Sequence, residues 1–151
     1  MTNWFEDVAE LTHKGQIKVP YTWSVGEVGS RFLVALRDQK RILGNRCGQC
    51  RTVFVPPRNR CGKCFGEIHE WIELGDEGIV TAHTIVRYNH PIQPTPTPFA
   101  YAIVKLDGAD VGFIHIIKED LGRLKNGVRV KARFSESRRG HILDIDSFTI
   151  I

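Results

Sequence analysis

The sequence predicts a mainly β protein in which N-terminal helices are followed by a small four-cysteine unit and a five-stranded barrel. Three observations support this prediction. Apolar residues recur at helical spacing before residue 44, the four cysteines lie close together in the next stretch, and five short segments after residue 70 have the character of β-strands. We therefore divide the 151-residue chain into an N-terminal helical segment (1–44), a cysteine-rich unit (45–70) and a β domain (71–151).

Two amphipathic helices are expected before the cysteines. Residues 3–14 place aromatic and aliphatic side chains at helical spacing. The connector 15–23 should be extended, because Pro20 disfavours helix at the residue before it. Ser24 and Glu27 have the spacing of a capping box, and the apolar side chains of SRFLVALRDQKRIL then share one face. This second helix should lead directly into the cysteine-rich unit.

The cysteines form two C-x-x-C pairs, Cys47 with Cys50 and Cys61 with Cys64. A two-residue gap lets one tight turn direct two thiolates at a common point, and two such turns supply the four soft ligands of a structural zinc ion. Four thiolates leave no coordination site open for catalysis. The alternatives are two disulfides, which need an exported protein, and a redox-active C-x-x-C, which would not come duplicated at this spacing. Residues 45–70 are therefore predicted to be a zinc ribbon.

The backbone around the cysteines shows how the ribbon should form. The segment TVFVPP (52–57) is expected to be one strand of a hairpin, which its two prolines end. Gly48, Gly62 and Gly66 are expected to let the chain curl around the metal.

The β domain is predicted to be an OB-fold. The expected strands are residues 78–88, 99–107, 110–117, 128–134 and 142–150. Residues 107–110 should form a tight turn, and a bulge near Asp146 and Ser147 would restore the alternation of the last strand. Residues 118–127 can form a short helical turn. Five strands with that insertion fit the five-stranded, partly open barrel of the OB-fold.

Two features of the β domain are unusual for a small barrel. The strand 99–107 is apolar on both faces, so a second body should cover its outer face: the zinc ribbon, the N-terminal helix or another chain. The loop 89–98 holds four of the seven prolines. A proline-rich loop is stiff and loses little entropy on contact, which suits either a binding loop or a rigid connector.

Charge is distributed unevenly along a chain whose net charge is +4. Residues 31–64 hold nine Lys or Arg and one acidic residue, Asp38, whereas residues 67–77 hold five acidic and no basic residues. The basic block suits an anionic partner such as nucleic acid, a phosphorylated cofactor or an acidic protein surface. A solvated face is the alternative.

The sequence gives no sign of export or membrane insertion. The N-terminus carries acidic residues and lacks the basic and apolar regions of a signal peptide, and no apolar run is long enough to span a bilayer. We expect a cytoplasmic protein whose cysteines stay reduced and available to metal.

No catalytic motif stands out, so we expect a protein that is not an enzyme on its own. The cysteines are committed to metal, and the sequence has no nucleophile elbow, phosphate loop or dinucleotide fingerprint. His83 and His115 lie in expected strands and should have satisfied rings, while His90 in the proline loop is a better functional candidate. From the residues alone, a nucleic-acid partner and a protein or small-molecule partner stay equally open.

The order of the motifs resembles one family. RFLVALRDQKRILGNRC, FVPPRNRC, EWIELGDEGIVTAHTIV and PFAYAIVKLDG follow one another within residues 24–134. They are similar to small zinc-ribbon and OB-fold proteins, once grouped as a domain of unknown function, that accompany thiolase-fold enzymes and acyl-CoA lyases. The N-terminal TNWFEDVAEL and the long lead helix are most similar to the small subunits of benzoylsuccinyl-CoA thiolases from anaerobic toluene degradation.

The resemblance implies a non-catalytic Zn²⁺-binding subunit of a hetero-oligomer. Such a subunit docks on a thiolase-like acyl-CoA C-acyltransferase and helps bind or channel an acyl-CoA, a coenzyme A thioester that the complex shares, such as benzoylsuccinyl-CoA. Single-stranded nucleic-acid binding is the alternative function. The four cysteines match the family's metal ligands, and family members often have asparagine where this chain has His115. Candidate contacts to acyl-CoA or to the partner are Arg58, Tyr88, His90, Phe99 and Tyr101.

Overall fold

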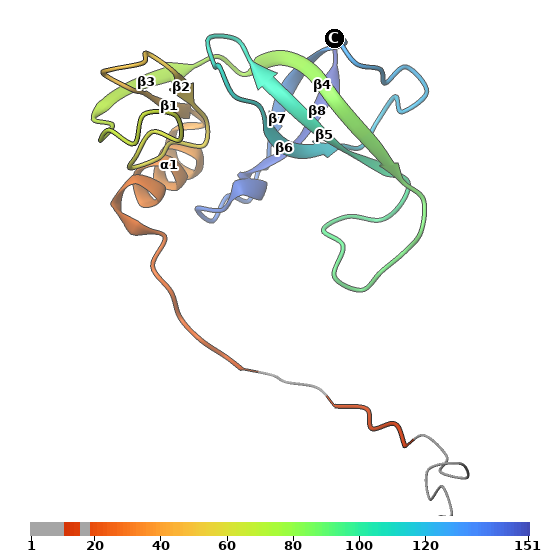
Figure 1. Ribbon diagram of the computed structural model, residues 1–151. Coiled ribbons are helices and arrows are strands. Elements are labelled where there is room, and N and C mark those ends of the chain that lie inside the picture. The colour runs from red at the N-terminus through yellow and green to blue at the C-terminus, as the bar shows by residue number, and fades with distance from the viewer. Residues whose placement is uncertain (1–10, 16–18) are drawn as a thin grey trace, which may run out of the picture.

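The computed structural model describes residues 11–15 and 19–151, which form a helix, a small three-stranded sheet and a β-barrel (Figure 1). The first part contains α1 (Gly26–Gln39), β1 (Ile42–Arg46), β2 (Val53–Phe54) and β3 (Glu70–Leu74). The barrel contains β4 (Glu77–Val86), β5 (Phe99–Leu106), β6 (Phe113–Ile117), β7 (Arg129–Phe134), the 3₁₀ turn η1 (Ile142–Asp144) and β8 (Ile145–Ile150). The helix described here is too short to cross a membrane.

The start of the chain tests only part of the N-terminal prediction. Most of the helix expected over residues 3–14 lies outside the described residues, and Leu11–Gly15 are exposed and not helical. The second helix is present, but the expected capping box is not. Its first residue is Gly26, whose N–H donates to Ser24 Oγ at 3.1 Å, and no side chain caps the helix at Val25.

The second helix ends earlier than its apolar pattern predicted. Lys40 adopts a left-handed conformation (φ 55°) that terminates α1, and Ile42–Arg46 then form β1 at the centre of the sheet β2-β1-β3. The predicted direct passage from helix to cysteines is therefore wrong. Gly44 fits this strand closely, because a Cβ there would lie 2.8 Å from the Phe54 carbonyl oxygen.

The predicted five-stranded barrel is confirmed, as a closed barrel with the order β4-β5-β6-β8-β7. The bulge expected near Asp146 is present, because Arg133 pairs with Ser147 and Phe134 with Ile145, which leaves Asp146 unpaired between them. A second bulge at Thr81 bends β4 against β5. The apolar interior of the barrel is continuous with residues of α1 and of the ribbon sheet, so a single core joins the two parts.

One turn of the barrel bonds directly to the ribbon sheet. The Val53 N–H donates to Asp110 Oδ2 at 2.8 Å, and the Asp110 N–H donates to the Val53 carbonyl at 3.1 Å. Val53 belongs to β2, while Asp110 follows the turn that leaves β5. These two hydrogen bonds satisfy the outer edge of β2 and fix the ribbon against the barrel.

The basic block is not a free positive surface, because β3 carries the acidic block alongside β1. The resulting ion pairs are Arg41–Glu73, Arg46–Glu70 (2.7 Å), Arg51–Glu70 (3.2 Å) and Arg60–Glu67 (3.0 Å). Arg31 instead lies over the Trp71 ring (4.4 Å to its centroid). Four of the nine basic residues of the block are therefore paired with the acidic block, which reduces the positive surface that an anionic partner could use.

His115 is a buried residue whose ring is fully hydrogen-bonded. The Ile116 N–H donates to Nδ1 at 2.8 Å, so Nε2 carries the proton and donates to the Ile142 carbonyl at 3.2 Å. The rings of Phe113 and Phe148 pack edge-on against it. Burial lowers the pKa of His115, against an opposing effect of its backbone hydrogen bonds and of Asp146, while Lys118 acts in the same direction as burial.

The buried His115 predicts a loss of stability in mild acid. Since its pKa is lower in the folded state than in the unfolded chain (about 6.5), its contribution is complete above pH 6.5 and is lost as the pH falls below that value. We expect the free energy of unfolding to fall between pH 6.5 and 5, by up to about 1.4 kcal/mol per pH unit. Denaturant titrations across this range should show a flatter profile for His115→Asn. An equal slope in the two proteins would contradict the assignment.

Candidate metal centre and contact surface

The two C-x-x-C turns have the same backbone design. In the first, the Cys47 N–H donates to the Thr52 carbonyl (3.0 Å) and the Cys47 carbonyl accepts from Arg51 (3.0 Å). In the second, Cys61 makes the equivalent bonds with Gly66 (2.9 Å) and Phe65 (3.1 Å). Each pair of cysteines is thus held in one hydrogen-bonded loop, and the two loops face each other across the site.

The left-handed residues of these loops are not the glycines that were expected to shape them. Arg51 (φ 59°) and Phe65 (φ 58°), each directly after the second cysteine of its pair, hold positive φ values. Gly48, Gly62 and Gly66 have no such conformation. The hydrogen bonds of the loops impose the turn on ordinary residues, so glycine is not required there.

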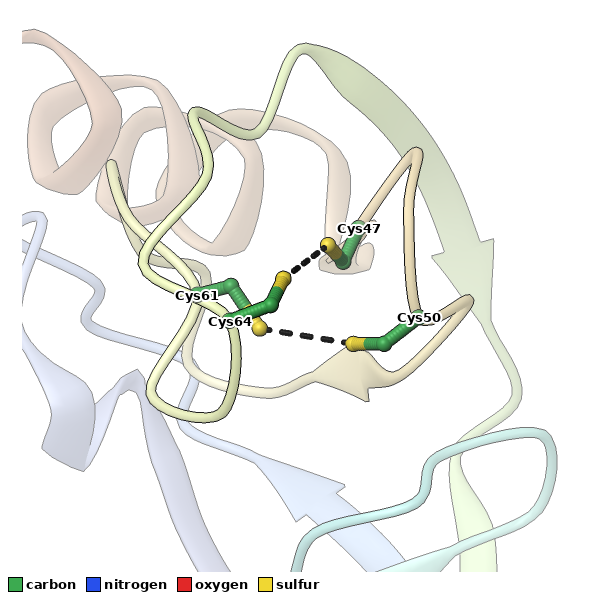
Figure 2. A group of neighbouring side chains, drawn as sticks. All are labelled: Cys47, Cys50, Cys61 and Cys64. Atoms are coloured by element: carbon green, nitrogen blue, oxygen red, sulfur yellow. Dashed lines mark hydrogen bonds between the residues drawn. The ribbon is translucent and has the colours of Figure 1, made fainter.

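The four sulfurs converge on a single point (Figure 2). Their ligand atoms all lie within 4.8 Å of one another, and the pairs Cys47–Cys64 and Cys50–Cys61 are each 3.4 Å apart. A tetrahedral zinc ion with Zn–S bonds of about 2.3 Å needs sulfurs about 3.8 Å apart. The arrangement therefore fits one four-coordinate ion bound by these cysteines.

A hydroxyl near the sulfurs prepares one ligand for the metal. Thr52 is buried, and its Oγ1 lies 3.2 Å from Cys50 Sγ. Hydrogen bonds from Thr52 are the main reason that the pKa of Cys50 falls to about 6. Because metals bind the thiolate, this contact favours the ligand state. Sequence reasoning did not identify Thr52, although it is the second residue after the first C-x-x-C.

The fold brings three of the five candidate contact residues together. Tyr88, His90 and Tyr101 line one hollow of about 380 Å³ between β5 and the loop 87–98, where Ile92 joins them. Arg58 lies apart, on the ribbon, with its guanidinium 5.3 Å from the centroid of the Phe54 ring.

The fifth candidate is ruled out as a direct contact. Phe99 is fully buried at the start of β5, and its ring packs edge-on against Tyr101 with centroids 5.1 Å apart. It therefore packs beside Tyr101 and offers no surface to a ligand.

The proline loop is fixed by side-chain hydrogen bonds as well as by its prolines. Gln93 Nε2 donates to the Tyr88 carbonyl (2.8 Å), and Gln93 Oε1 accepts from the His90 N–H (2.9 Å). At the neck of the loop, Thr97 Oγ1 donates to Asn89 Oδ1 at 2.6 Å. These polar residues went unnoticed in the sequence, because only the fold brings the two ends of the loop together.

The outer face of β5 is exposed in the part of the chain that the structure describes. A second, mostly apolar hollow of about 240 Å³ lies on it, shares Tyr101 with the first, and is bordered by Ile103 and Ile114. Ile114 is 65% exposed and Ile92 is 85% exposed. We call Tyr88, Ile92, Tyr101, Ile103 and Ile114 the apolar strip. Neither the ribbon nor α1 covers it, so the expectation that the ribbon covers this face is wrong, while most of the helix expected over residues 3–14 lies outside the described residues.

Comparison with known proteins supports both parts of the fold. A protein-family model described as the ChsH2 rubredoxin-like zinc ribbon domain matches residues 35–70. A second family model, described as the ChsH2 C-terminal OB-fold domain, matches residues 71–135. The chain is 29% identical over 73 residues to a DUF35 domain-containing scaffold protein from Methanocaldococcus jannaschii. That match spans 48% of this chain and 52% of the relative, about half of each.

Two solved structures have a similar fold. A DUF35-family protein of unknown function from Sulfolobus solfataricus has a TM-score of 0.59 and 28% identity, over 72% of this chain and 77% of its own. A structure described as an Ltp2-ChsH2(DUF35) aldolase has a TM-score of 0.60, covering 85% of this chain and 95% of its own. Its identity to this chain is 18%, so it supports the fold alone.

Removal of the metal should unfold the ribbon. We expect Cys61→Ser to lose the zinc that the wild-type protein binds at one ion per chain, with a loss of several kcal/mol of stability, because few apolar residues remain to hold the ribbon. Metal analysis and thermal unfolding followed by circular dichroism measure both effects. A zinc-free Cys61→Ser protein that melts like the wild type would show that the ion is not structural.

Thr52 should affect zinc affinity without being a ligand. Thr52→Val removes the hydroxyl beside Cys50 but keeps the shape of the side chain, and we expect zinc to bind about tenfold or more weakly. Competition with a chromophoric chelator gives the dissociation constant. Thr52→Ser, which retains the hydroxyl, is the matched control and should bind like the wild type. Equal weakening in both variants would assign the effect to packing.

Proposed function

Because the chain belongs to the ChsH2 family, whose zinc-ribbon and OB-fold domains it carries one after the other, we propose that it is a non-catalytic subunit of a thiolase-type enzyme complex. The ribbon is stabilised by one Zn²⁺ bound to the four cysteines. The barrel docks on a catalytic subunit, an acyl-CoA C-acyltransferase, and bond formation or cleavage takes place on that partner. The naming of a related chain as a scaffold protein supports this division of roles.

The apolar strip carries the docking proposal. Ile92, Ile103 and Ile114 are exposed on the barrel and its loop. Burial of an isoleucine side chain is favourable, so a contact that covers these three residues would gain free energy. Contiguous exposed apolar residues on a globular domain mark a protein interface or a ligand groove. The strip lies on strands paired in a closed barrel and on a loop fixed by Gln93, so it is already ordered for contact.

The hollow beside the proline loop suits the acyl end of an acyl-CoA. Tyr88 and Tyr101 offer aromatic surface to the phenyl ring of an acyl group such as benzoylsuccinyl. His90 Nδ1 accepts from the Ile92 N–H at 3.4 Å, which leaves Nε2–H free to donate to a carbonyl or carboxylate. Arg58 on the ribbon is the candidate for the CoA phosphates, because guanidinium binds phosphate oxygens in pairs.

The alternative, binding of single-stranded nucleic acid, has less support. An OB-fold of that kind presents aromatic residues within a positive groove. Here the apolar strip contains no basic residue, and four of the nine basic residues of the basic block are paired with Glu67, Glu70 and Glu73.

Substitution in the apolar strip should abolish complex formation. We expect Ile114→Asn to weaken binding to the thiolase-like catalytic chain of the same organism by about 30-fold or more, because it places a polar amide in the centre of an apolar contact. Isothermal titration calorimetry or native mass measurement of the co-expressed chains provides the comparison. Ile151→Asn is the matched control, because Ile151 is also exposed (54%) and lies outside the strip.

Two results would contradict the proposal. Equal loss of affinity in Ile114→Asn and Ile151→Asn would remove the strip from the interface. A purified wild-type chain that forms no complex with the catalytic chain, and whose absorbance at 260 nm falls as salt is raised, would favour nucleic-acid binding instead.

A further inference from the structure

The segment before α1 carries large apolar side chains that the described part of the fold leaves in solvent. We call residues 19–25, VPYTWSV, the arm. Val19, Tyr21, Trp23 and Val25 are 65%, 77%, 68% and 42% exposed. They occupy every second position, with Pro20, Thr22 and Ser24 between them. This is the period of a β-strand with one apolar face. The residues of that face belong to neither of the core clusters.

The backbone of the arm has one edge that can pair and one that cannot pair fully. In a strand, the N–H and C=O of alternate residues point to opposite edges. Val19, Tyr21 and Trp23 supply the first edge, with all of its donors intact, and Val25 is already the N-cap of α1. Pro20 lacks an N–H on the second edge. A strand with one intact edge and one edge blunted by proline is suited to the outermost position of a sheet.

This fold offers the arm few edges of its own. The barrel is closed, although β4 pairs with β7 only over Glu77–Ile79 and β6 pairs with β8 only at Ile117, so the open edges are confined to parts of these two strands. In the ribbon sheet, β2 is only two residues long and bonds Asp110 through Val53. The other outer strand, β3, carries Glu70 and Glu73, and charged side chains protect an edge from strand addition. A second copy of the chain has the same strands, so it offers no better site.

We propose that the arm adds as an edge strand to a free sheet edge of the catalytic partner. Tyr21 and Trp23, two residues apart on the same face of the arm, would each enter an apolar pocket on that partner. This inference rests on the function proposed above. In the view of Figure 1, the arm and the loop 87–98 project beyond the body in the same direction, so one partner can contact both. The addition of a strand gains affinity from main-chain hydrogen bonds and specificity from alternate side chains.

The test uses the full chain and the co-expressed catalytic subunit. We expect Tyr21→Ala and Trp23→Ala each to weaken the complex about tenfold or more, because large aromatic residues dominate interface energy. Thr22→Pro is the matched control. It removes an N–H from the edge that Pro20 already blunts and keeps the extended backbone, so its affinity should stay within about twofold of the wild type.

Hydrogen exchange of the complex provides a second readout that a merely apolar contact would not produce. The amides of Tyr21 and Trp23 should be protected on binding, while the amide of Thr22 continues to exchange rapidly. Uniform protection, or no protection, would overturn strand addition, as would an equal effect of Thr22→Pro and Trp23→Ala.

The outcomes separate this inference from the function on which it rests. If the wild-type chain forms no complex with the catalytic subunit, the proposed function fails and the inference fails with it. If the complex forms and the arm variants bind it like the wild type, only the arm inference fails. A concentration-dependent dimer of the chain alone, lost in Trp23→Ala, would assign the arm to self-association and overturn the proposal.

Discussion

The convergence of four sulfurs on one point is the constraint on which the N-terminal half of the structure depends. Around them the ribbon has a core of few residues, chiefly Cys47, Phe54, Cys61 and Ile68, two of which are themselves ligands. So small a cluster buries too little apolar surface to offset the entropy of ordering two loops. An ion bound by both loops supplies the missing free energy and fixes β2 between them. The matching hydrogen bonds of the two loops show that each holds its pair of cysteines in the same geometry.

The ribbon and the barrel act as one body because three kinds of contact join them. Their apolar interiors are continuous, Val53 and Asp110 exchange backbone and side-chain hydrogen bonds, and the acidic residues of β3 neutralise the basic residues of β1 and the loops beside it. The surface ion pairs contribute little to stability, but they reduce the positive field of the basic block. Within the described residues, the surfaces proposed to contact a partner are the apolar strip on one face of the barrel and the arm before α1.

Local pattern predicted the barrel well and the junctions poorly. Most strands of the barrel and the bulge at Asp146 could be read from alternation, although residues 142–144, predicted as strand, form the 3₁₀ turn η1. β1 could not, because Ile42–Arg46 continue a helical pattern, and their pairing with β3 depends on residues far along the chain. The same holds for the paired charges. Among the site residues, the four cysteines followed from spacing, and Tyr88, His90 and Tyr101 do share a hollow. Phe99 could not be recognised as buried, because the sequence does not show whether an aromatic residue at the start of a strand faces the interior or the solvent.

The hydrogen bonds between Val53 and Asp110 have a consequence for assembly. Val53 lies in the hairpin between the two ligand pairs, and Asp110 lies in the connection between the two strands that carry Ile103 and Ile114. A newly made chain that has not acquired its ion lacks the anchor that holds β2 against this connection. Under the function proposed above, loss of the ion would therefore loosen the connection that positions Ile103 and Ile114, so that zinc binding and docking would be coupled through this one contact.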